Sequence, residues 1–400
     1  MKIAYILTFC PWPPDTGTKI RCFQILKHLS ARHQFHVVII SNSLSVPPPP
    51  PGLNGQPASV TLFNPATGAV SPVSNFAARM KSLITFHPYT QDPDLTRRIS
   101  AFLLEKKPGA VLVAGSRAAH YLDLKHKLPG VPYMIEEGCM DHMRFAFALP
   151  LARNPMERMR TMFNMARTRR FERWMCARMD KIFAPTAAER DCIEQLCNTD
   201  VELLPAGANI ELFQYHYAGD DNQTLLFCGD MSYSPNADAA IFLLKDILPG
   251  VIARFPDIKC YIVGRGASSD IQSQARRFNQ VVLTGYVEDV RPYFRESSIF
   301  VSPMRYGRGY ISKIMDAFAA GPAVVATRFL IGSLDVTEGK ELLIADDAHG
   351  MVEKIDMLIQ SPGRKKALSM EGRAYAEKRT WEKALKPLSD YIEALEAGTK

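Results

Sequence analysis

The stretch from Arg305 to Thr327, RYGRGYISKIMDAFAAGPAVVAT, decides the fold of this chain. It predicts a glycine-broken loop, a helix from Gly309 to Ala320, a Gly-Pro stop and a strand over Ala323–Ala326. The strand is apolar on both faces, which is typical of a buried strand in a parallel sheet. A helix that leads directly into such a strand indicates an alternating α/β fold.

The polar residues of the same stretch predict an anion site. Lys313 and Asp316 are three residues apart, so both lie on one helix face near its start. With Arg308 between Gly307 and Gly309, an anion there would meet free N–H groups and two fixed cations. Asp316, one turn deeper, could accept hydrogen bonds from a sugar hydroxyl. The pattern suits a nucleoside diphosphate, and the alternative is a surface helix with ordinary charges.

The rest of the chain continues the alternation in two runs. Strands are predicted at Ile3–Thr8, Phe35–Ser41, Ala110–Ala114, Pro132–Ile135, Lys181–Pro185, Thr224–Cys228, Lys259–Val263, Val281–Leu283 and Ile299–Val301. Helices are predicted between them at Lys19–Leu29, Leu95–Lys106, Ala237–Leu244 and Val290–Glu296. A polar linker within Leu204–Asp221 separates the two runs. Because ligands of such sheets bind beyond the carboxyl ends of the strands, we expect the site between the two units.

Composition is that of an ordinary globular protein, with 47% hydrophobic and 22% charged residues over 400 positions. This length favours roughly two to three domains. No apolar run approaches the about 20 residues that span a bilayer, and the first residues resemble a buried strand more than a secretory signal. Eight cysteines without a CxxC pair make zinc improbable and favour a reducing cytoplasm.

The positive charge is concentrated in one stretch. Nine Lys or Arg residues against three acids lie between Arg153 and Lys181, nearly the whole net charge of +7, with Met, Phe and Trp interleaved. This pattern predicts docking on an anionic membrane surface. The equally open alternative is an Arg-rich helix that packs its apolar side on its own domain. Nucleic acid is a weaker option, because no known binding motif accompanies the charge.

Several segments together resemble the retaining glycosyltransferases of the GT-B fold, in the group 1 family of bacterial mannosyl- and glucosyltransferases. The matching segments are TFCPWPPDTGTKIRCFQILKHLS, LLPAGANIELF, LLFCGDMSYSPNADAAIFL, YIVGRG, VVLTGYVEDVRPYF, VSPMRYGRGYISKIMDAFAAGPAVVAT and RTWEKALKPL. Their order and spacing carry the resemblance, since each piece alone is weak. It implies two Rossmann-like domains facing a cleft: an acceptor domain over 1–205, a donor domain over 206–376, and a helix over 377–400 that crosses back to the first.

The resemblance also assigns residues. The donor-binding set is Gly17, Thr18, Gly229, Gly285, Tyr286, Val287, Gly309 and Asp316, and the catalytic candidates are Arg308, Lys313, Glu137 and His142. The diphosphate would lie on Arg308 and Lys313, the ribose on Asp316, and the base near Tyr286. Alternatives remain: Gly17 as a plain turn, Tyr286 as strand-end packing, and Asn236 and Asp238 as helix caps, which we favour for that pair.

The chain departs from the family in three places. Many relatives carry two acids seven residues apart in the late helix, where this chain has Arg308 and Asp316. Many also carry an Arg and a Lys in the region that reads GDMSYSPN here, and one variant branch replaces that pair with a loop similar to that of Arg308 and Lys313. The usual histidine near the reaction centre is not obvious. Its neighbourhood, IEEGCMDHMRF, offers Glu137, Asp141 and His142, and a lone histidine is more often structural.

The resemblance thus implies transfer of a sugar from a nucleotide-sugar donor to a hydroxyl acceptor, with retention of configuration. No metal cofactor is expected, because no pair of acids lies in a suitable loop and Asp220-Asp221 falls in the linker. The acceptor would be a polysaccharide, a lipid-linked glycan or a small molecule. The protein would be cytoplasmic and could bind peripherally to the inner face of the membrane. The rival interpretations are a nucleotide-sugar epimerase on the same fold and a non-catalytic nucleotide-sugar-binding partner.

Overall fold

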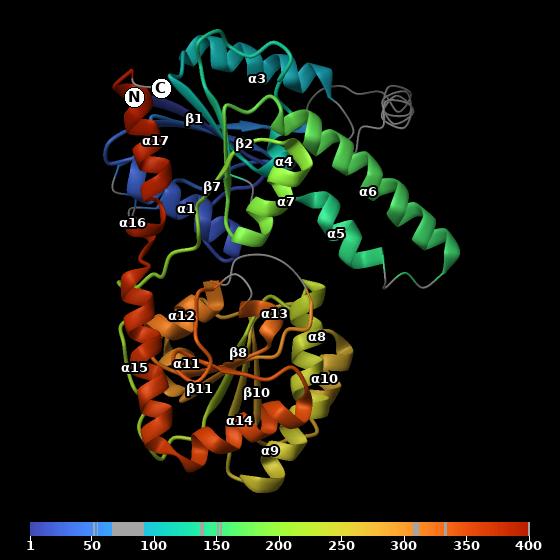
Figure 1. Ribbon diagram of the computed structural model, residues 1–400, viewed down its shortest axis with the longest axis vertical. Coiled ribbons are helices and arrows are strands. Elements are labelled where there is room, and N and C mark those ends of the chain that lie inside the picture. Colours follow the sequence, from blue (N-terminus) through green and yellow to red (C-terminus); the bar gives the residue numbers. More distant parts are fainter. Residues whose placement is uncertain are drawn as a thin grey trace. The chain divides into compact units, whose positions relative to one another are not determined.

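The computed structural model describes residues 1–50, 53, 55–65, 92–136, 140–149, 152, 154–306, 312–331 and 334–398 (Figure 1). These residues divide into two compact units. The first comprises Met1–Pro205 and Leu385–Lys400, and the second comprises Ala206–Gly307 and Ile311–Ala384. The chain therefore leaves the first unit once and returns to it for its last helix.

The first unit is built on a parallel sheet in the order β3-β2-β1-β4-β5-β6-β7. Its strands are β1 (Lys2–Leu7), β2 (Gln34–Ile40), β3 (Ser59–Phe63), β4 (Ala110–Ala114), β5 (Tyr133–Glu136), β6 (Lys181–Ala184) and β7 (Val201–Leu203). The register pairs Ile3 with Phe35 on one side of β1 and with Ala110 on the other. The central strands are fully buried because apolar side chains cover both faces.

Helices cover this sheet on both faces (Figure 1). They are α1 (Gly17–Leu29), α3 (Pro93–Lys106), α4 (Gly115–Ala119), α5 (Asp141–Ala148), α6 (Pro155–Cys176), α7 (Ala187–Cys197) and α17 (Lys386–Glu396). Although α17 is last in the chain, its Tyr391 ring meets Phe183 of β6 edge-on, with centroids 6.2 Å apart. Leu388 and Ile392 of α17 are fully buried, so the helix belongs to this unit's core.

The second unit contains a parallel sheet in the order β10-β9-β8-β11-β12-β13. Its strands are β8 (Leu225–Cys228), β9 (Cys260–Val263), β10 (Val281–Gly285), β11 (Ile299–Ser302), β12 (Ala323–Ala326) and β13 (Leu343–Ile344). Along β8, Phe227 packs into one apolar cluster and Leu226 into the other, so each face of the sheet has its own core. This explains why the strands read as continuous apolar runs.

The helices of the second unit follow the strands in the expected alternation. They are α8 (Ser234–Phe242), a π-helical turn (Leu243–Ile247), α9 (Leu248–Arg254), α10 (Ser269–Ala275), α11 (Arg291–Glu296), α12 (Ser312–Ala320), α13 (Arg328–Ile331), α14 (Ala348–Gln360), α15 (Pro362–Lys378) and α16 (Trp381–Ala384). The predicted α/β class is confirmed. Three short strands, β3, β7 and β13, were not predicted from the sequence, and α8 begins three residues earlier than expected.

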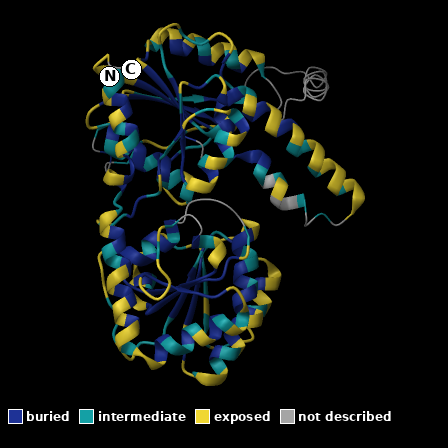
Figure 2. Cartoon of the chain, viewed as in Figure 1, coloured by how far each residue is buried: buried dark blue, intermediate teal, exposed yellow. Residues whose placement is uncertain are grey.

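Helix α6 makes up most of the basic stretch, and its two halves differ in burial. In the second half, Phe171 and Met175 are buried in the core of the first unit. In the first half, the helix projects beyond the sheet, and Met156, Met159, Met162 and Phe163 are exposed (Figure 2). The packing alternative therefore holds for one half of α6 only. No described helix is long and apolar enough to span a bilayer.

Candidate functional site

Glycines line the carboxyl edge of the second sheet, where the chain leaves β8, β9 and β10. Gly264 has φ +139°, and a Cβ on it would lie 1.9 Å from the carbonyl oxygen of Gly229, so only glycine fits this approach of two backbones. Gly285 has φ +69°, and no described atom lies within 4 Å of where its Cβ would be. The edge thus combines a closely packed floor with open space beside β10.

Lys313 extends from α12 over this floor. Its Nζ donates a hydrogen bond to the Oδ1 of Asn236 over 2.9 Å. A Cβ on Gly229 would lie 2.6 Å from the same Nζ, so the ammonium sits directly above the glycine that follows β8. Burial lowers the pKa of Lys313, although the nearby Cys228, Asp230 and Asp316 act to raise it. The result is a partly desolvated cation at the carboxyl edge.

Asp316 lies on the same face of α12, as its spacing from Lys313 predicts. It is half-buried, and burial raises its pKa to about 7, although Lys313 acts to lower it. A carboxyl group with this pKa changes its charge near neutrality. It can therefore accept hydrogen bonds when ionised and donate one when protonated.

Asn236 and Asp238 do not cap α8, so the capping interpretation is wrong. The helix begins at Ser234 and its N-cap position is Tyr233. Asn236 donates from Nδ2 to the backbone oxygen of Asp230 over 2.8 Å. Asp238 accepts two hydrogen bonds from Arg305, of 3.0 Å from Nε and 2.6 Å from Nη2. Both side chains thus make contacts that link distant parts of the second unit.

The structure is informative about some of the remaining donor candidates in this unit. Tyr286 is 64% exposed, so strand-end packing does not explain it, whereas Val287 is half-buried against an apolar cluster. Arg308 and Gly309 lie outside the described residues. Arg305, just before them, is held by Asp238 and lies over the Phe242 ring at 4.6 Å, which fixes the start of that loop.

In the first unit, Gly17 and Thr18 occupy the first turn of α1. The N-cap residue Thr16 makes no side-chain capping bond among the described residues. Arg21 attaches this helix to the sheet. It forms a buried ion pair with Glu136 at the end of β5, and its Nη1 donates a hydrogen bond to the backbone oxygen of Leu204 over 2.8 Å. Tyr5 donates to the same carboxylate over 2.7 Å. The sequence showed Arg21 within a motif, but not its partner 115 positions away.

His142 is held in an ion pair at the base of the hairpin formed by α5 and α6. Its Nδ1 lies 2.5 Å from Oε2 of Glu172, a fully buried carboxylate. Burial acts to lower the pKa of His142, but hydrogen bonds with Cys192 and Glu172 raise it to about 9. The ring is therefore protonated at neutral pH, which suits a structural ion pair better than a general base. Glu137 lies outside the described residues, and Asp141 pairs with Arg117 at 2.9 Å.

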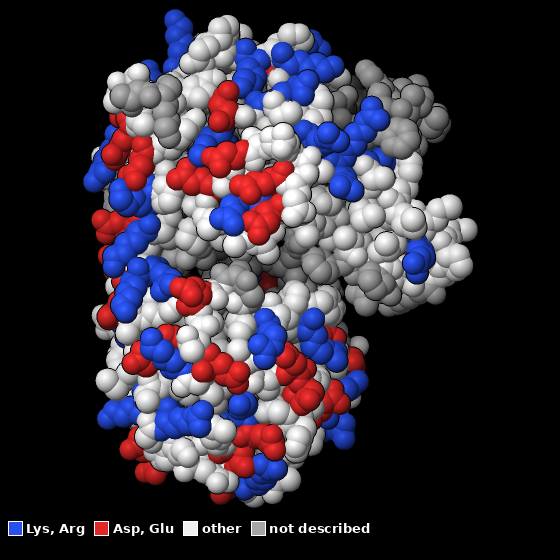
Figure 3. Space-filling model, viewed as in Figure 1, with Lys and Arg blue, Asp and Glu red and all other residues white. Residues whose placement is uncertain are grey.

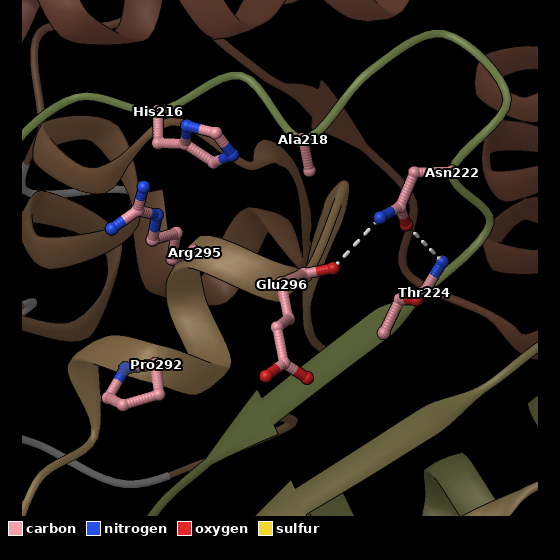
Figure 4. A pocket seen from close by; sticks show the side chains of 7 residues that line it. All are labelled: His216, Ala218, Asn222, Thr224, Pro292, Arg295 and Glu296. Atoms are coloured by element: carbon pink, nitrogen blue, oxygen red, sulfur yellow. Dashed lines mark hydrogen bonds between the residues drawn. The ribbon is translucent and has the colours of Figure 1, made fainter.

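Two further observations concern ligands. Within the part of the chain that the structure describes, no group of three His, Cys, Asp or Glu side chains could hold a metal ion. A pocket of about 510 Å³ lies in the second unit, lined by His216, Ala218, Asn222, Thr224, Pro292, Arg295 and Glu296 (Figure 4). Thr224 precedes β8, so this pocket is at the amino end of the strand, opposite Gly229 and Lys313.

Residues 222–361 match the family model described as glycosyl transferases group 1. The chain contains a group 1 glycosyltransferase domain. Phosphatidyl-myo-inositol mannosyltransferase of Mycolicibacterium smegmatis is 29% identical over 180 residues, which cover 43% of this chain and 46% of the relative. An uncharacterised 44.6 kDa protein in the cps region of Klebsiella pneumoniae is 27% identical over 142 residues, 34% of this chain and 37% of that protein. The matches thus span less than half the length of these curated relatives.

Solved structures resemble the whole chain. Sucrose-phosphate synthase from Thermosynechococcus elongatus superposes with a TM-score of 0.73 at 17% identity and covers 100% of both chains. WaaG, a glycosyltransferase involved in lipopolysaccharide biosynthesis, gives 0.65 at 13% identity, covering 98% of this chain and 99% of that one. The likeness confirms the predicted GT-B fold. Gly229, Asn236, Lys313 and Asp316 all fall within the group 1 glycosyltransferase domain.

Proposed function

We propose that the protein transfers a sugar from a nucleotide-sugar to a hydroxyl acceptor, with retention of configuration and without a divalent metal. The observation that carries this proposal is the Lys313 ammonium above Gly229, at the carboxyl edge of a group 1 glycosyltransferase domain. The family's usual Arg and Lys after the first strand of this domain are missing from GDMSYSPN. Here Lys313 of α12 places a cation at the carboxyl end of β8 instead.

The chemistry explains why a cation is needed there. Breaking the bond between the sugar and the diphosphate leaves negative charge on the phosphate oxygens. A fixed ammonium stabilises that charge more as it develops, so it lowers the barrier instead of only binding the donor. Arg308 would add a second cation, and Asp316 would accept hydrogen bonds from the ribose. Retention rests on the family resemblance.

We further propose a lipid-linked or polysaccharide acceptor reached at an anionic membrane. The relatives include mannosyltransferases named for phosphatidyl-myo-inositol and a glycosyltransferase of lipopolysaccharide biosynthesis. The projecting half of α6 supports this proposal, because Met156 is 76% and Met159 67% exposed, with Arg158 and Arg160 exposed beside them. In Figure 3 the visible face of this described part carries blue but no red atoms. Apolar side chains flanked by arginines fit the boundary between headgroups and acyl chains.

A donor assay tests the transfer. A thermal-shift panel of nucleoside diphosphates identifies the base, and the matching nucleotide-sugars are then incubated with and without hydroxyl acceptors and with EDTA. We expect slow donor hydrolysis alone, faster turnover with acceptor, and full activity with the chelator. Interconversion of the nucleotide-sugar without acceptor would indicate an epimerase. Binding without any turnover would indicate a non-catalytic partner. Loss of activity with EDTA that magnesium restores would indicate a metal requirement.

Vesicle sedimentation tests the membrane proposal. We expect binding to vesicles that contain phosphatidylglycerol, weakened by salt because charges are screened within about 10 Å at 0.1 M, and little binding to phosphatidylcholine alone. Met159→Asp with Phe163→Asp should reduce binding at least about tenfold, since both charges would enter the apolar layer. Met370→Asp, at an exposed methionine of the second unit, is the matched control. Equal binding of both variants would contradict the proposal.

A further inference from the structure

Asn236 is a buried amide that connects two segments far apart in the sequence. Its side chain is 6% exposed and lies at the start of α8. One end of the amide donates to the backbone of Asp230, and the other accepts from Lys313, which is 77 positions away. It thus touches the only cation that the described residues place directly above Gly229.

The surroundings fix which way this amide points. Its Nδ2 needs an acceptor, and the Asp230 carbonyl provides one at 2.8 Å. Asp230 is itself held, because its carboxylate accepts from the backbone N–H of Ser232 over 3.0 Å and from Nε of Arg265 over 2.8 Å. Since Nδ2 is committed to the carbonyl, Oδ1 must face Lys313. An ammonium has only donors, so this oxygen is the complementary partner.

We propose that Asn236 is a positioning residue for glycosyl transfer, whose amide oxygen holds the Lys313 ammonium over Gly229 to meet the diphosphate of the donor. The inference rests on the proposed function, because it requires Lys313 to contact the leaving group. The four-carbon stem of a lysine side chain is flexible, so without a fixed partner the ammonium would sample many positions. A fixed acceptor removes this freedom before the donor binds, which is the essence of preorganisation.

The choice of an amide over a carboxylate has a chemical reason. A neutral acceptor orients the ammonium without cancelling its charge, so the charge remains available for phosphate. The ionisable groups that face Lys313 are Cys228 at the end of β8, Asp230 in the loop that follows, and Asp316 on α12. An acid at position 236 would be the third beside Lys313, after Asp230 and Asp316, and would oppose binding of a dianionic ligand.

The experiment is a double-mutant cycle on the full chain with Asn236→Ala, Lys313→Ala and the double variant. The readouts are kcat and KM for the nucleotide-sugar and the Kd of the matching nucleoside diphosphate. We expect Asn236→Ala to reduce kcat by about 10²-fold, the scale of a misplaced catalytic group. In the Lys313→Ala background the same change should cost less than about twofold, because the group that it positions is gone.

The pH profile gives a readout that a merely structural role would not move. Without its oxygen partner the ammonium is less stable, so the alkaline limb of kcat/KM should shift to lower pH in Asn236→Ala. Asn236→Asp should shift it to higher pH and weaken diphosphate binding.

The matched control is Asn222→Ala. That amide also bridges two segments, donating to the oxygen of Glu296 over 2.9 Å and accepting from the N–H of Thr224 over 2.8 Å, but at the amino end of β8. Its kinetics should equal those of the wild type.

The outcomes distinguish a failure of the proposed function from a failure of the role assigned to Asn236. Full activity of Lys313→Ala would overturn the proposed phosphate site and this inference with it. Impaired Lys313→Ala beside fully active Asn236→Ala, or losses that multiply in the double variant, would overturn the inference alone. If Asn236→Ala does not fold, Gly229→Ala decides. Its Cβ would meet side-chain atoms only, Nζ of Lys313 at 2.6 Å and Cγ of Asn236 at 3.0 Å, so the fold should survive while the contact between these two side chains is disturbed and kcat falls. Unchanged kcat in that variant would also overturn the inference.

Discussion

Asp316 shows at the scale of one residue how burial changes the chemistry of a side chain that the sequence presents as an ordinary acid. Its pKa of about 7 arises mainly because burial penalises the ionised form. In the unfolded chain the same group ionises near the ordinary aspartate pKa of 3.8. Between these two values the folded protein binds a proton that the unfolded chain has released, so folding becomes less favourable as the pH rises.

We therefore expect Asp316→Asn to stabilise the protein in a pH-dependent way. The melting temperature of the wild type should fall relative to that of the variant from about pH 4 to pH 7, and the gap should then remain constant. Differential scanning calorimetry in a series of buffers measures it. Parallel curves over this range would mean that Asp316 is ionised in the folded protein throughout.

The candidate site could be predicted from the sequence only where its residues are neighbours in the chain. Lys313 and Asp316 share a helix face because of their spacing, and the structure keeps them there. Asn236 was assigned to a helix cap because a polar residue near a helix start is usually one. Its actual partners are the Asp230 backbone and Lys313, and no local pattern reveals a contact over 77 positions.

Among the elements, the base of the α5–α6 hairpin contains a buried ion pair between His142 and Glu172. The pKa of His142 is about 9 in the folded protein, whereas the ordinary histidine pKa, expected in the unfolded chain, is 6.5. Its contribution to stability is therefore complete below about pH 6.5 and is lost as the pH rises through 9. Removing it leaves the fully buried Glu172 carboxylate without this partner.

We expect His142→Ala to destabilise the protein by about 3 kcal/mol near pH 6, as for other buried pairs that lose one member. The loss should shrink toward pH 10. His126→Ala is the control, because its pair with Asp123 is at the surface and surface pairs contribute about 0–1 kcal/mol. Urea unfolding at pH 6 and pH 10 measures both. A loss of equal size at the two pH values would show that packing, not charge, is what His142 provides.

The elements most accurately predicted are the central strands, because both of their faces are buried and the apolar run is continuous. The missed strands lie at or near sheet edges and are short or half-exposed. β3 has only Phe63 buried, β7 has three residues and β13 has two. The basic stretch could not be resolved from the sequence, since its apolar residues look alike in both halves of α6 although only one half packs.

On the scale of the whole molecule, the second unit carries its own cores. The members of both of its apolar clusters lie between Ala208 and Ala376, and Trp381 closes against Gly207. We expect a fragment of residues 206–384 to unfold cooperatively on its own and to bind the nucleoside diphosphate. Circular dichroism melts and calorimetric titration measure this. A folded fragment without affinity would place the main diphosphate contacts in the first unit.

The return of α17 to the first unit has a consequence for how the chain is made. During synthesis the strands of the first unit emerge early, but Leu388 and Ile392, which complete its core, are translated only after the whole second unit. The second unit is a continuous segment and can fold on the ribosome as soon as it has emerged, whereas the first unit keeps an apolar surface exposed until α17 is made. A chain that stops just before α17 would therefore hold a folded second unit together with a first unit whose apolar surface is exposed, and this is the form that chaperones and proteases would be expected to bind.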